Sequence, residues 1–243
     1  MSPIDQIAFL WIGDDNYIPT LLVKSINLAY KNRVKIFHLT NFNTKKIEGT
    51  SKTVRLNLPK DIMLARLKAY KDFPYNNKLT FFCDADSLFV RELNLFDLKK
   101  DIYLIKRSEN FTMNHLWPEH YPEFLNKNSI EIMPYLFGGM AFRNGKAFFT
   151  ELLETCFKLP ERFHRWYGDQ YSLMINIKKN NYEINFLPIE LYLKIVKRII
   201  YHQDFNILYD NNIKIITFKG SSNKKFIEES YINLVQFYQN KSS

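Results

Sequence analysis

The sequence predicts a protein of the α/β class, and three observations support this prediction. Strand-like and helix-like segments alternate along the chain, as they do in sheets that are covered by helices. The length of 243 residues makes one domain the default and is sufficient for a full hydrophobic core. Apolar residues make up 46% of the chain and charged residues 24%, which is the composition of an ordinary globular protein.

The first half of the chain shows this alternation most clearly. Residues 7–12 are a continuous apolar run that predicts a buried strand, and a polar turn follows at 13–16. Apolar positions at helical spacing predict a helix over 18–30. The same reasoning predicts, in order, strands at 34–39 and 54–58, an amphipathic helix at 61–71 and a strand at 79–83.

The second half contains further elements and one irregular stretch. Residues 109–134 carry three prolines and predict an irregular, partly exposed segment. Regular elements are predicted at 101–105 (strand), 137–142 (strand opened by two glycines), 148–157 and 169–177 (helices), and 213–218 (strand). Residues 191–201 mix lysine and arginine with aliphatic side chains, which favours either a helix at a membrane interface or a core helix with extended lysines.

Two aspartates at the end of an apolar strand are the most informative motif. Asp84 and Asp86 follow the run Phe81-Phe82-Cys83, and a second apolar stretch follows them. In an extended segment, side chains at i and i+2 share a face. Carboxylates so placed can hold a hard divalent cation, which can also bind the oxygens of a diphosphate. The alternative to metal binding is that the two aspartates lie in a surface turn and have only a structural role.

Three further motifs carry candidate chemistry, and each also has a purely structural interpretation. Asp169 and Gln170 begin a predicted helix, where an aspartate can simply cap the helix. The pair Gly138-Gly139 predicts either a bulge or a close approach of a ligand to the backbone. Arg66 lies within a helix and is either a surface residue or a phosphate ligand.

A small basic loop follows the last predicted strand. Lys219, Lys224 and Lys225 flank Gly220-Ser221-Ser222, and this arrangement suits phosphate oxygens as well as solvent. The five histidines show no spacing that is typical of zinc sites.

Charge and cysteine content restrict the partners and the compartment that we expect. The formal charge of +9 is compatible with nucleic acid, an anionic membrane or a polyanionic substrate. No zinc-finger or RNP-type motif accompanies the charge, so no nucleic acid partner is expected. No signal peptide or membrane span is apparent, and Cys83 and Cys156 predict reduced core residues. We therefore expect a cytoplasmic protein.

Taken in order, the motifs resemble those of GT-A glycosyltransferases, with the layout of the retaining enzymes of family 8. The run at 137–139 is also similar to family 6 enzymes. The segments that match successive motifs are Ile7 to Tyr17, Ala65-Arg66-Leu67, Phe82 to Val90, Leu95-Phe96, Phe137-Gly138-Gly139-Met140, Asp169-Gln170-Tyr171 and Thr217 to Asn223. Together they extend over nearly the whole chain.

This resemblance implies a GT-A fold, that is, a single Rossmann-like domain over 1–243 with a mixed central sheet. Residues 1–100 would be the nucleotide-binding half, and residues 101–243 the acceptor-binding half. It implies a UDP-hexose donor, Mn²⁺ or Mg²⁺ held by Asp84 and Asp86, and transfer to a hydroxyl of a glycan. A lipid-linked acceptor, such as a lipooligosaccharide or capsule glycan, would place the enzyme peripherally at the inner face of the membrane.

The resemblance also implies roles for individual residues. Donor-binding residues would be Trp11, Tyr17, Arg66, Asp84, Ala85, Asp86, Gly138, Gly139, Lys219, Gly220 and Lys224. The catalytic residues Asp169 and Gln170 would lie beside the anomeric carbon. With retention, Gln170 is not a strong nucleophile, so front-face attack guided by the leaving phosphate is expected. With inversion, Asp169 would be the general base.

The sequence departs from the family pattern at three positions. Thr217 stands in place of a histidine that binds the metal, Asn223 in place of a lysine that binds phosphate, and Tyr171 in place of a second aspartate. These departures leave the subfamily, and with it the choice between retention and inversion, open.

The sequence is also compatible with two functions of a different kind. A haloacid-dehalogenase-type phosphatase also uses two aspartates at a strand end, although it usually carries them near the N-terminus and needs a later acidic pair. A basic module that binds membranes or nucleic acid without catalysis is the second such function, and it depends on residues 191–201.

Overall fold

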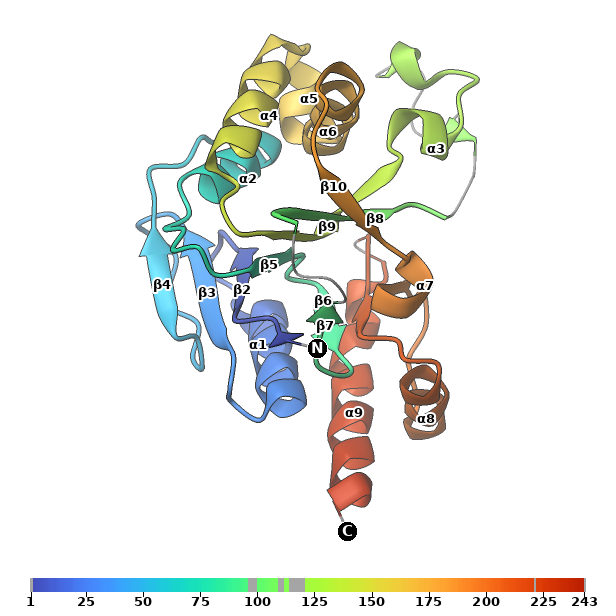
Figure 1. The fold of residues 1–243 in the computed structure, drawn as a ribbon. Coiled ribbons are helices and arrows are strands. Elements are labelled where there is room, and N and C mark those ends of the chain that lie inside the picture. Colours follow the sequence, from blue (N-terminus) through green and yellow to red (C-terminus); the bar gives the residue numbers. More distant parts are fainter. Residues whose placement is uncertain (1, 96–99, 109–111, 114–120, 221, 243) are drawn as a thin grey trace.

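A mixed seven-stranded sheet forms the centre of the protein (Figure 1). The computed structural model describes residues 2–95, 100–108, 112–113, 121–220 and 222–242. The strand order is β10-β8-β9-β5-β2-β3-β4. The bounds are β2 (Gln6–Leu10), β3 (Lys35–Thr40), β4 (Lys52–Arg55), β5 (Thr80–Cys83), β8 (Ile102–Lys106), β9 (Tyr135–Phe142) and β10 (Ile184–Leu187). β9 runs antiparallel to both of its neighbours, and the other pairs are parallel.

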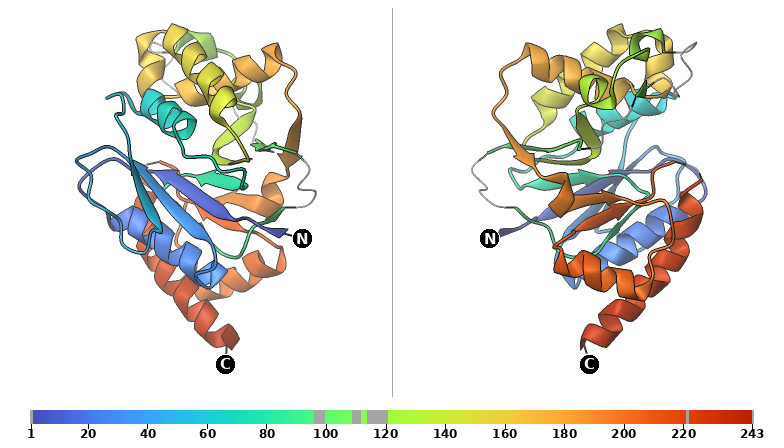
Figure 2. Two further views of the ribbon diagram at one scale, coloured as in Figure 1. Left: turned by 60° about the vertical axis from the view of Figure 1, so that its left-hand side comes forward. Right: turned by 90° about the vertical axis from the view of Figure 1, so that its right-hand side faces the viewer.

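Helices cover both faces of this sheet (Figure 2). One face carries α1 (Tyr17–Tyr30) and, beside it, α9 (Ile227–Ser242). The other face carries α2 (Ile62–Lys71), α4 (Lys146–Lys158) and α6 (Gly168–Lys179). Because central strands of such sheets are buried on both faces, they are apolar throughout, as the runs at 7–12 and 79–83 are. β5 is fully buried at each of its residues.

Alternate residues of the strands supply two hydrophobic cores. Phe9 and Phe81 point to the face of α1, where they join Ile26. Phe82 points to the opposite face and packs with Phe149 of α4. This division follows from the period of two in a strand.

A second, three-stranded sheet lies next to the C-terminal helix. It consists of β6 (Ser87–Phe89), β11 (Leu193–Ile195) and β12 (Ile215–Thr217), and its apolar side chains pack with α8 (His202–Asp210) and α9. The remaining elements are short: β1 (Ser2–Pro3), β7 (Asn94–Leu95), η2 (Pro122–Phe124), α3 (Ser129–Ile132), α5 (Glu161–Arg165), α7 (Ile189–Tyr192) and η3 (Lys224–Phe226).

The predicted helix over 191–201 is wrong. Helix α7 ends at Tyr192, and β11 begins at the next residue. Leu193 is buried whereas Lys194 is exposed, which is the alternation of a strand, and both pair in parallel with β12. Val196 continues the pairing by donating its N–H to the carbonyl of Thr217 at 2.9 Å. Hydrogen bonding with β12 therefore determines the conformation of these residues, and not their helical pattern. The helix that the membrane-interface interpretation requires is not formed there.

Other predicted elements are present with shifted bounds. The strand predicted at 54–58 occupies 52–55, and the glycine pair lies inside β9 instead of at its start. A register shift between β8 and β9 falls opposite these glycines, at Leu104 and Ile105, as the bulge interpretation predicts. The described part of residues 109–134 includes the short helices η2 and α3. Phe96, which the resemblance singled out, lies outside the described residues.

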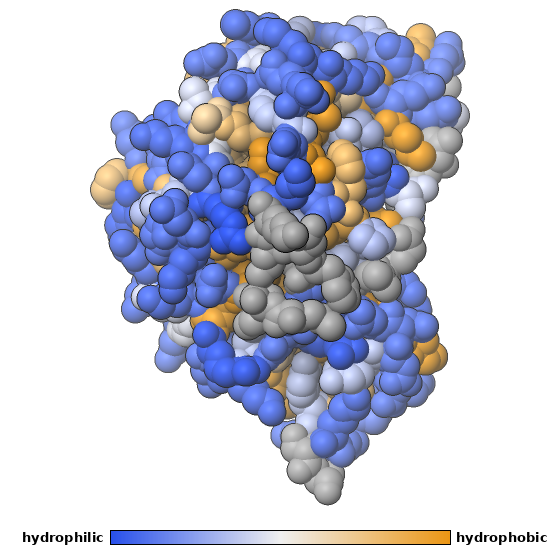
Figure 3. Space-filling model, in the orientation of Figure 1, coloured by the Kyte–Doolittle hydropathy of each residue, from blue (hydrophilic) through white to orange (hydrophobic). Residues whose placement is uncertain are grey.

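Both cysteines are free and buried, as predicted. In the part of the chain that the structure describes, no helix is both long and apolar enough to cross a lipid bilayer. The face seen in Figure 1 is mostly hydrophilic, and apolar side chains reach it in small patches (Figure 3).

Candidate active site

The order of the strands marks one edge of the sheet as the place for a ligand. From β2 the chain moves to β3 and β4 on one side, and it then returns to place β5 on the other side of β2. Ligands of open α/β sheets bind at the carboxyl ends of the strands where the order reverses in this way. Trp11 follows β2 and Asp84 follows β5, so both lie at this edge.

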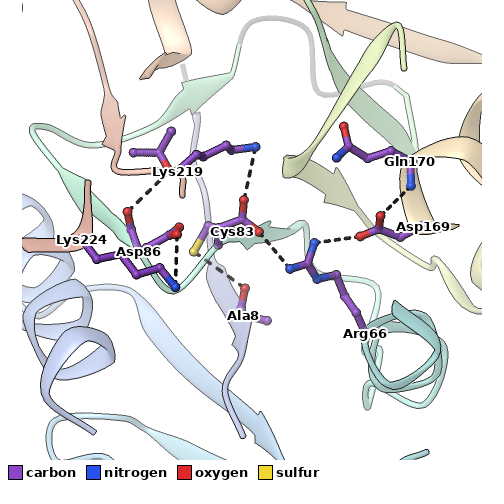
Figure 4. A network of polar contacts seen from close by, with 10 residues as sticks. Ala8, Arg66, Cys83, Asp86, Asp169, Gln170, Lys219 and Lys224 are labelled. Atoms are coloured by element: carbon purple, nitrogen blue, oxygen red, sulfur yellow. Dashed lines mark hydrogen bonds and ion pairs between the residues drawn. The ribbon is translucent and has the colours of Figure 1, made fainter. Parts of the chain in front are cut away.

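A tight connection between β5 and β6 carries the two aspartates (Figure 4). The carbonyl of Asp86 accepts hydrogen bonds from the N–H of Phe218 at 2.9 Å and from the hydroxyl of Thr217 at 3.5 Å. Between the aspartates, Ala85 is buried. The backbone of the motif is thus fixed against the end of β12, while the carboxylates of Asp84 and Asp86 are only 14% and 16% exposed.

Arg66 links the first aspartate to the start of α6. From α2, its guanidinium lies 3.6 Å from Oδ1 of Asp84 and donates a hydrogen bond of 2.8 Å to Oδ2 of Asp169. The other oxygen of Asp169 accepts the N–H of Gln170 at 2.7 Å. One cation therefore joins residues from α2, the β5–β6 connection and α6, as the sticks in Figure 4 show.

Two lysines approach the aspartates from the opposite side. The ammonium of Lys219 lies 3.4 Å from Oδ2 of Asp84, and that of Lys224 lies 3.9 Å from Oδ2 of Asp86. Lys219 lies two residues beyond the end of β12, and Lys224 begins η3. The small turn between them includes Gly220, whose φ is +90°. The predicted basic loop is therefore brought to the aspartates.

Burial and charge act in opposite directions on the acidic groups. Burial alone would raise the pKa of Asp84, but the charges of Lys219 and Arg66 outweigh it and hold that pKa below its usual value. Burial, together with the charge of Asp84, raises the pKa of Asp86 to about 6. Burial also raises the pKa of Asp169 despite the neighbouring Arg66. Closely spaced carboxylates with separated pKa values are characteristic of functional sites.

The glycine pair is part of the same site. A Cβ atom at Gly138 would overlap the carboxylate of Asp84. Only glycine at position 138 therefore leaves space for that carboxylate. A Cβ atom at Gly139 would instead meet the side chain of Ile105. Gly138 therefore contributes to the site by allowing Asp84 its orientation.

The start of α6 differs from the predicted cap. The helix begins at Gly168 after Tyr167, which has a left-handed φ of +64°, and no side chain makes a capping hydrogen bond there. Asp169 lies within the first turn, so the capping interpretation is wrong in detail. Its carboxylate is 1% exposed.

Arg107 is a site residue that sequence reasoning missed. Its guanidinium donates to Oε1 of Gln170 at 3.1 Å and to the carbonyl of Met133 at 2.9 Å. These contacts fix the amide of Gln170, with its oxygen directed to Arg107. A signal existed in the sequence, because Arg107 follows a predicted strand.

The end of the site beside β2 contains polar atoms without partners. His38 stacks on Phe9 and donates from Nε2 to the carbonyl of Trp11 at 3.1 Å, so its Nδ1 is an acceptor. Among the described residues, this Nδ1, Nε1 of Trp11 and Oγ1 of Thr40 are buried without a hydrogen-bond partner. Tyr17 opens α1 nearby in sequence and is 45% exposed.

The residues present fit a divalent cation. Oδ1 of Asp84 and Oδ1 of Asp86 are buried and have no hydrogen-bond partner among the described residues, so one oxygen of each carboxylate makes no hydrogen bond. The guanidinium of Arg66 faces the first of these oxygens at 3.6 Å, which is an ion-pair distance and not a hydrogen bond. Carboxylate oxygens are the ligands that Mn²⁺ and Mg²⁺ prefer. No group of three or more His, Cys, Asp or Glu side chains that could hold a metal ion occurs among the described residues. Thr217, at the position of the expected histidine, is turned to the backbone of Asp86.

Comparisons with known proteins identify the fold. No family model and no curated protein matches the sequence. A glycosyltransferase involved in the glycosylation of the major capsid of PBCV-1 matches with a TM-score of 0.55 and 9% identity, over 95% of this chain and 100% of that one. The glycosyltransferase GlyE from Streptococcus pneumoniae TIGR4 matches with a TM-score of 0.56 and 15% identity, over 99% of this chain and 64% of that one.

Identities this low establish the fold alone. The α/β fold with a mixed central sheet is that of GT-A structures, which confirms the predicted fold class. The closer resemblance to family 8 and the roles of individual residues stay predictions.

Proposed function

We propose that the protein is a metal-dependent glycosyltransferase that moves a hexose from a UDP-sugar to a hydroxyl of a glycan acceptor, with retention of configuration. One observation carries the proposal: Asp84 and Asp86 meet Arg66, two lysines and the start of α6 at the carboxyl edge where the strand order reverses. Both similar structures above are described as glycosyltransferases, which supports it.

The chemistry of the site suits a nucleotide diphosphate. Lys219 and Lys224 carry ammonium groups on flexible stems that can bind phosphate oxygens. Asp84 and Asp86 would hold Mn²⁺ or Mg²⁺, which supplies charge neutralisation for the departing diphosphate when bound. Arg66 keeps the carboxylate of Asp84 at the edge of the sheet. Trp11, which directly follows β2, and Tyr17 would contact the nucleoside.

Retention is favoured by the surroundings of Asp169. A general base must accept a proton from the acceptor hydroxyl, so it needs a free and accessible oxygen. One oxygen of Asp169 bonds to Arg66, the other bonds to the N–H of Gln170, and the carboxylate is buried. Asp169 is therefore suited to hold Arg66 and α6 in place, whereas Gln170, whose amide oxygen accepts from Arg107, would lie beside the anomeric carbon.

The stereochemistry can be measured directly. Proton NMR of the product of transfer to a small acceptor, recorded before anomers equilibrate, distinguishes the two outcomes. We expect the anomeric configuration of the donor. An inverted product would restore Asp169 as base and exclude front-face attack.

The proposed donor site is tested by melting temperatures. A ligand that binds only the folded state raises the melting temperature by mass action. We expect a shift of several degrees with UDP and a matching UDP-sugar in the presence of Mn²⁺, and its loss in Asp86→Ala. The control Asp210→Ala removes an exposed carboxylate at the end of α8 and should keep the shift. If no nucleotide shifts the wild type, the proposal fails.

A phosphatase or a basic binding module would behave differently in simple assays. A phosphatase would hydrolyse a generic phosphate ester, and a basic binding module would sediment with anionic vesicles at low salt but not at high salt. Within 191–201 helix α7 ends at Tyr192 and strand β11 occupies Leu193–Ile195, which removes one of the observations that favoured the module. The acceptor, lipid-linked or free, and its place at a membrane remain part of the proposal.

A further inference from the structure

Lys219 occupies the position of a cation beside the first aspartate. Its ammonium lies 3.4 Å from Oδ2 of Asp84, on a side chain that is 29% exposed. A divalent ion bound to the carboxylate of Asp84 would lie within a few ångströms of this ammonium. Two cations at that separation repel each other, so the ammonium and the metal compete for the same carboxylate.

The charges of the site balance without any ligand. Three carboxylates, Asp84, Asp86 and Asp169, are each within ion-pair distance of a cation from the set Arg66, Lys219 and Lys224. A divalent ion alone would bring two uncompensated positive charges into this partly buried site. A nucleotide-sugar diphosphate carries about two negative charges. Metal and diphosphate together therefore leave the balance unchanged.

The backbone at Lys219 is fixed, but its side chain can rotate. The carbonyl of Lys219 accepts a hydrogen bond of 2.7 Å from the side chain of Asn223, and the preceding residue Phe218 bonds to Asp86. A lysine stem of four carbons can move its ammonium by several ångströms without backbone movement. The ammonium can thus leave Asp84 for a phosphate oxygen on the same side of the site.

We propose that Lys219 is a placeholder cation, which neutralises Asp84 in the free protein and transfers its ammonium to the diphosphate when metal and nucleotide enter together. This inference rests on the proposed function and extends it. On this account, Lys219 is the reason why the site binds a divalent ion well only when a diphosphate is bound with it.

The two ligands respond to loss of this lysine in opposite directions. In Lys219→Met, the affinity for Mn²⁺ without nucleotide rises by about threefold to tenfold, which is the scale of a partly exposed ion pair. The affinity for UDP at saturating Mn²⁺ falls by a similar or larger factor, because a phosphate contact is lost. The first is measured from the electron paramagnetic resonance signal of free Mn²⁺, the second by titration calorimetry.

Matched variants separate the placeholder role from general charge effects. Lys24→Met makes the same change in net charge at an exposed residue of α1 and should leave both affinities unchanged. Lys219→Arg keeps the charge and should keep Mn²⁺ binding weak. Lys219→Gln replaces the Met variant in the test if that variant does not fold.

Three results would overturn the inference. Unchanged or weaker Mn²⁺ binding in Lys219→Met, with weaker UDP binding, would show that Lys219 is a phosphate ligand alone. Tight Mn²⁺ binding by the wild type without nucleotide would show that no placeholder opposes the metal. Failure of the wild type to bind UDP with any metal would overturn the proposed function, and this inference with it.

Discussion

Arg66 is the residue on which the geometry of the site depends most, because its guanidinium contacts two carboxylates from distant parts of the chain. Burial would lower the pKa of Arg66, but Asp84 and Asp169 outweigh that effect and raise it, so the guanidinium stays charged. Lysine offers a single ammonium and cannot bridge both carboxylates in the same way.

Arg66→Met should destabilise the protein by about 2–4 kcal/mol, because it leaves the buried carboxylate of Asp169 without the cation that contacts it. Adding Asp169→Asn to this variant should restore about 1 kcal/mol or more, because the uncompensated charge is removed. Denaturant unfolding of the two single variants and the double variant measures the coupling. Losses that simply add would contradict the pairing.

Gly138→Ala tests the orientation of Asp84. The new methyl group would displace the carboxylate of Asp84 while the β9 backbone remains paired with β5. We expect the affinity for UDP with Mn²⁺ to fall by about tenfold or more, equivalent to about 1.4 kcal/mol. Calorimetry gives the affinity, and circular dichroism confirms that the variant is folded. Unchanged affinity in a folded variant would mean that Asp84 does not face the ligand.

At the scale of elements, a buried lysine lies directly before strand β12. Lys214 is 5% exposed, precedes β12 and donates to the side chain of Asn212 at 2.8 Å. Burial, and to a smaller extent the charge of Arg91, lower its pKa from 10.5 to about 8. Its carbonyl accepts the N–H groups of Val90 and Arg91, so the segment cannot move outward to solvate the ammonium without breaking this ladder.

Lys214→Met should therefore stabilise the protein by about 1–2 kcal/mol at pH 7, after allowance for solvent screening. Between pH 8 and 10.5 the unfolded wild type binds more protons than the folded one, so its stability rises with pH relative to the variant. The advantage of the variant is greatest below pH 8 and disappears above 10.5. Urea unfolding across this range checks both statements, and a constant difference would contradict them.

Several of the elements that sequence reasoning predicted are specified by their own residues, although helices α8 and α9 were not predicted. β2 and β5 are continuous apolar runs, and α4 has a clear apolar stripe. β10 was missed because it is an edge strand with three incompletely buried residues, and β6 because it has only three residues. β11 was predicted as helix because only its pairing with β12, some 20 residues later, decides its conformation.

The same distinction applies to the site. The aspartate pair could be found because both carboxylates follow one strand, and the glycines and lysines because their motifs are local. His38 was missed because its contact with Trp11 exists only after folding. Arg107 follows a predicted strand, but nothing in that position indicates its contact with Gln170. Sequence spacing alone also could not show that Asp169 is buried with both oxygens engaged.

At the scale of the whole molecule, the central sheet separates two cores that stabilise it from opposite faces. Phe82 is fully buried, and its ring centre lies 4.4 Å from that of Tyr70. Phe82→Ala should cost about 3–5 kcal/mol. Phe42→Ala, at a ring that is 65% exposed, should change stability by less than about 0.5 kcal/mol. Similar losses of stability for the two variants in thermal unfolding would contradict the packing of Phe82 in this core.

The site assembles from both halves of the chain. Arg66, Asp84 and Asp86 come from residues 1–100, and Asp169 and Lys219 from residues 101–243. The cations and carboxylates meet only at the edge of a sheet to which both halves contribute strands. A nucleotide-binding half and an acceptor-binding half remain our proposal for how these contributions divide the substrates.

Titration calorimetry of UDP at saturating Mn²⁺, in the wild type and in Asp86→Ala, tests the central claim most directly. We expect measurable binding by the wild type, strong weakening when Mn²⁺ is replaced by a chelator, and loss of binding in the variant. Equal binding of UDP by both proteins, or binding that does not depend on Mn²⁺, would contradict a diphosphate site at Asp84 and Asp86.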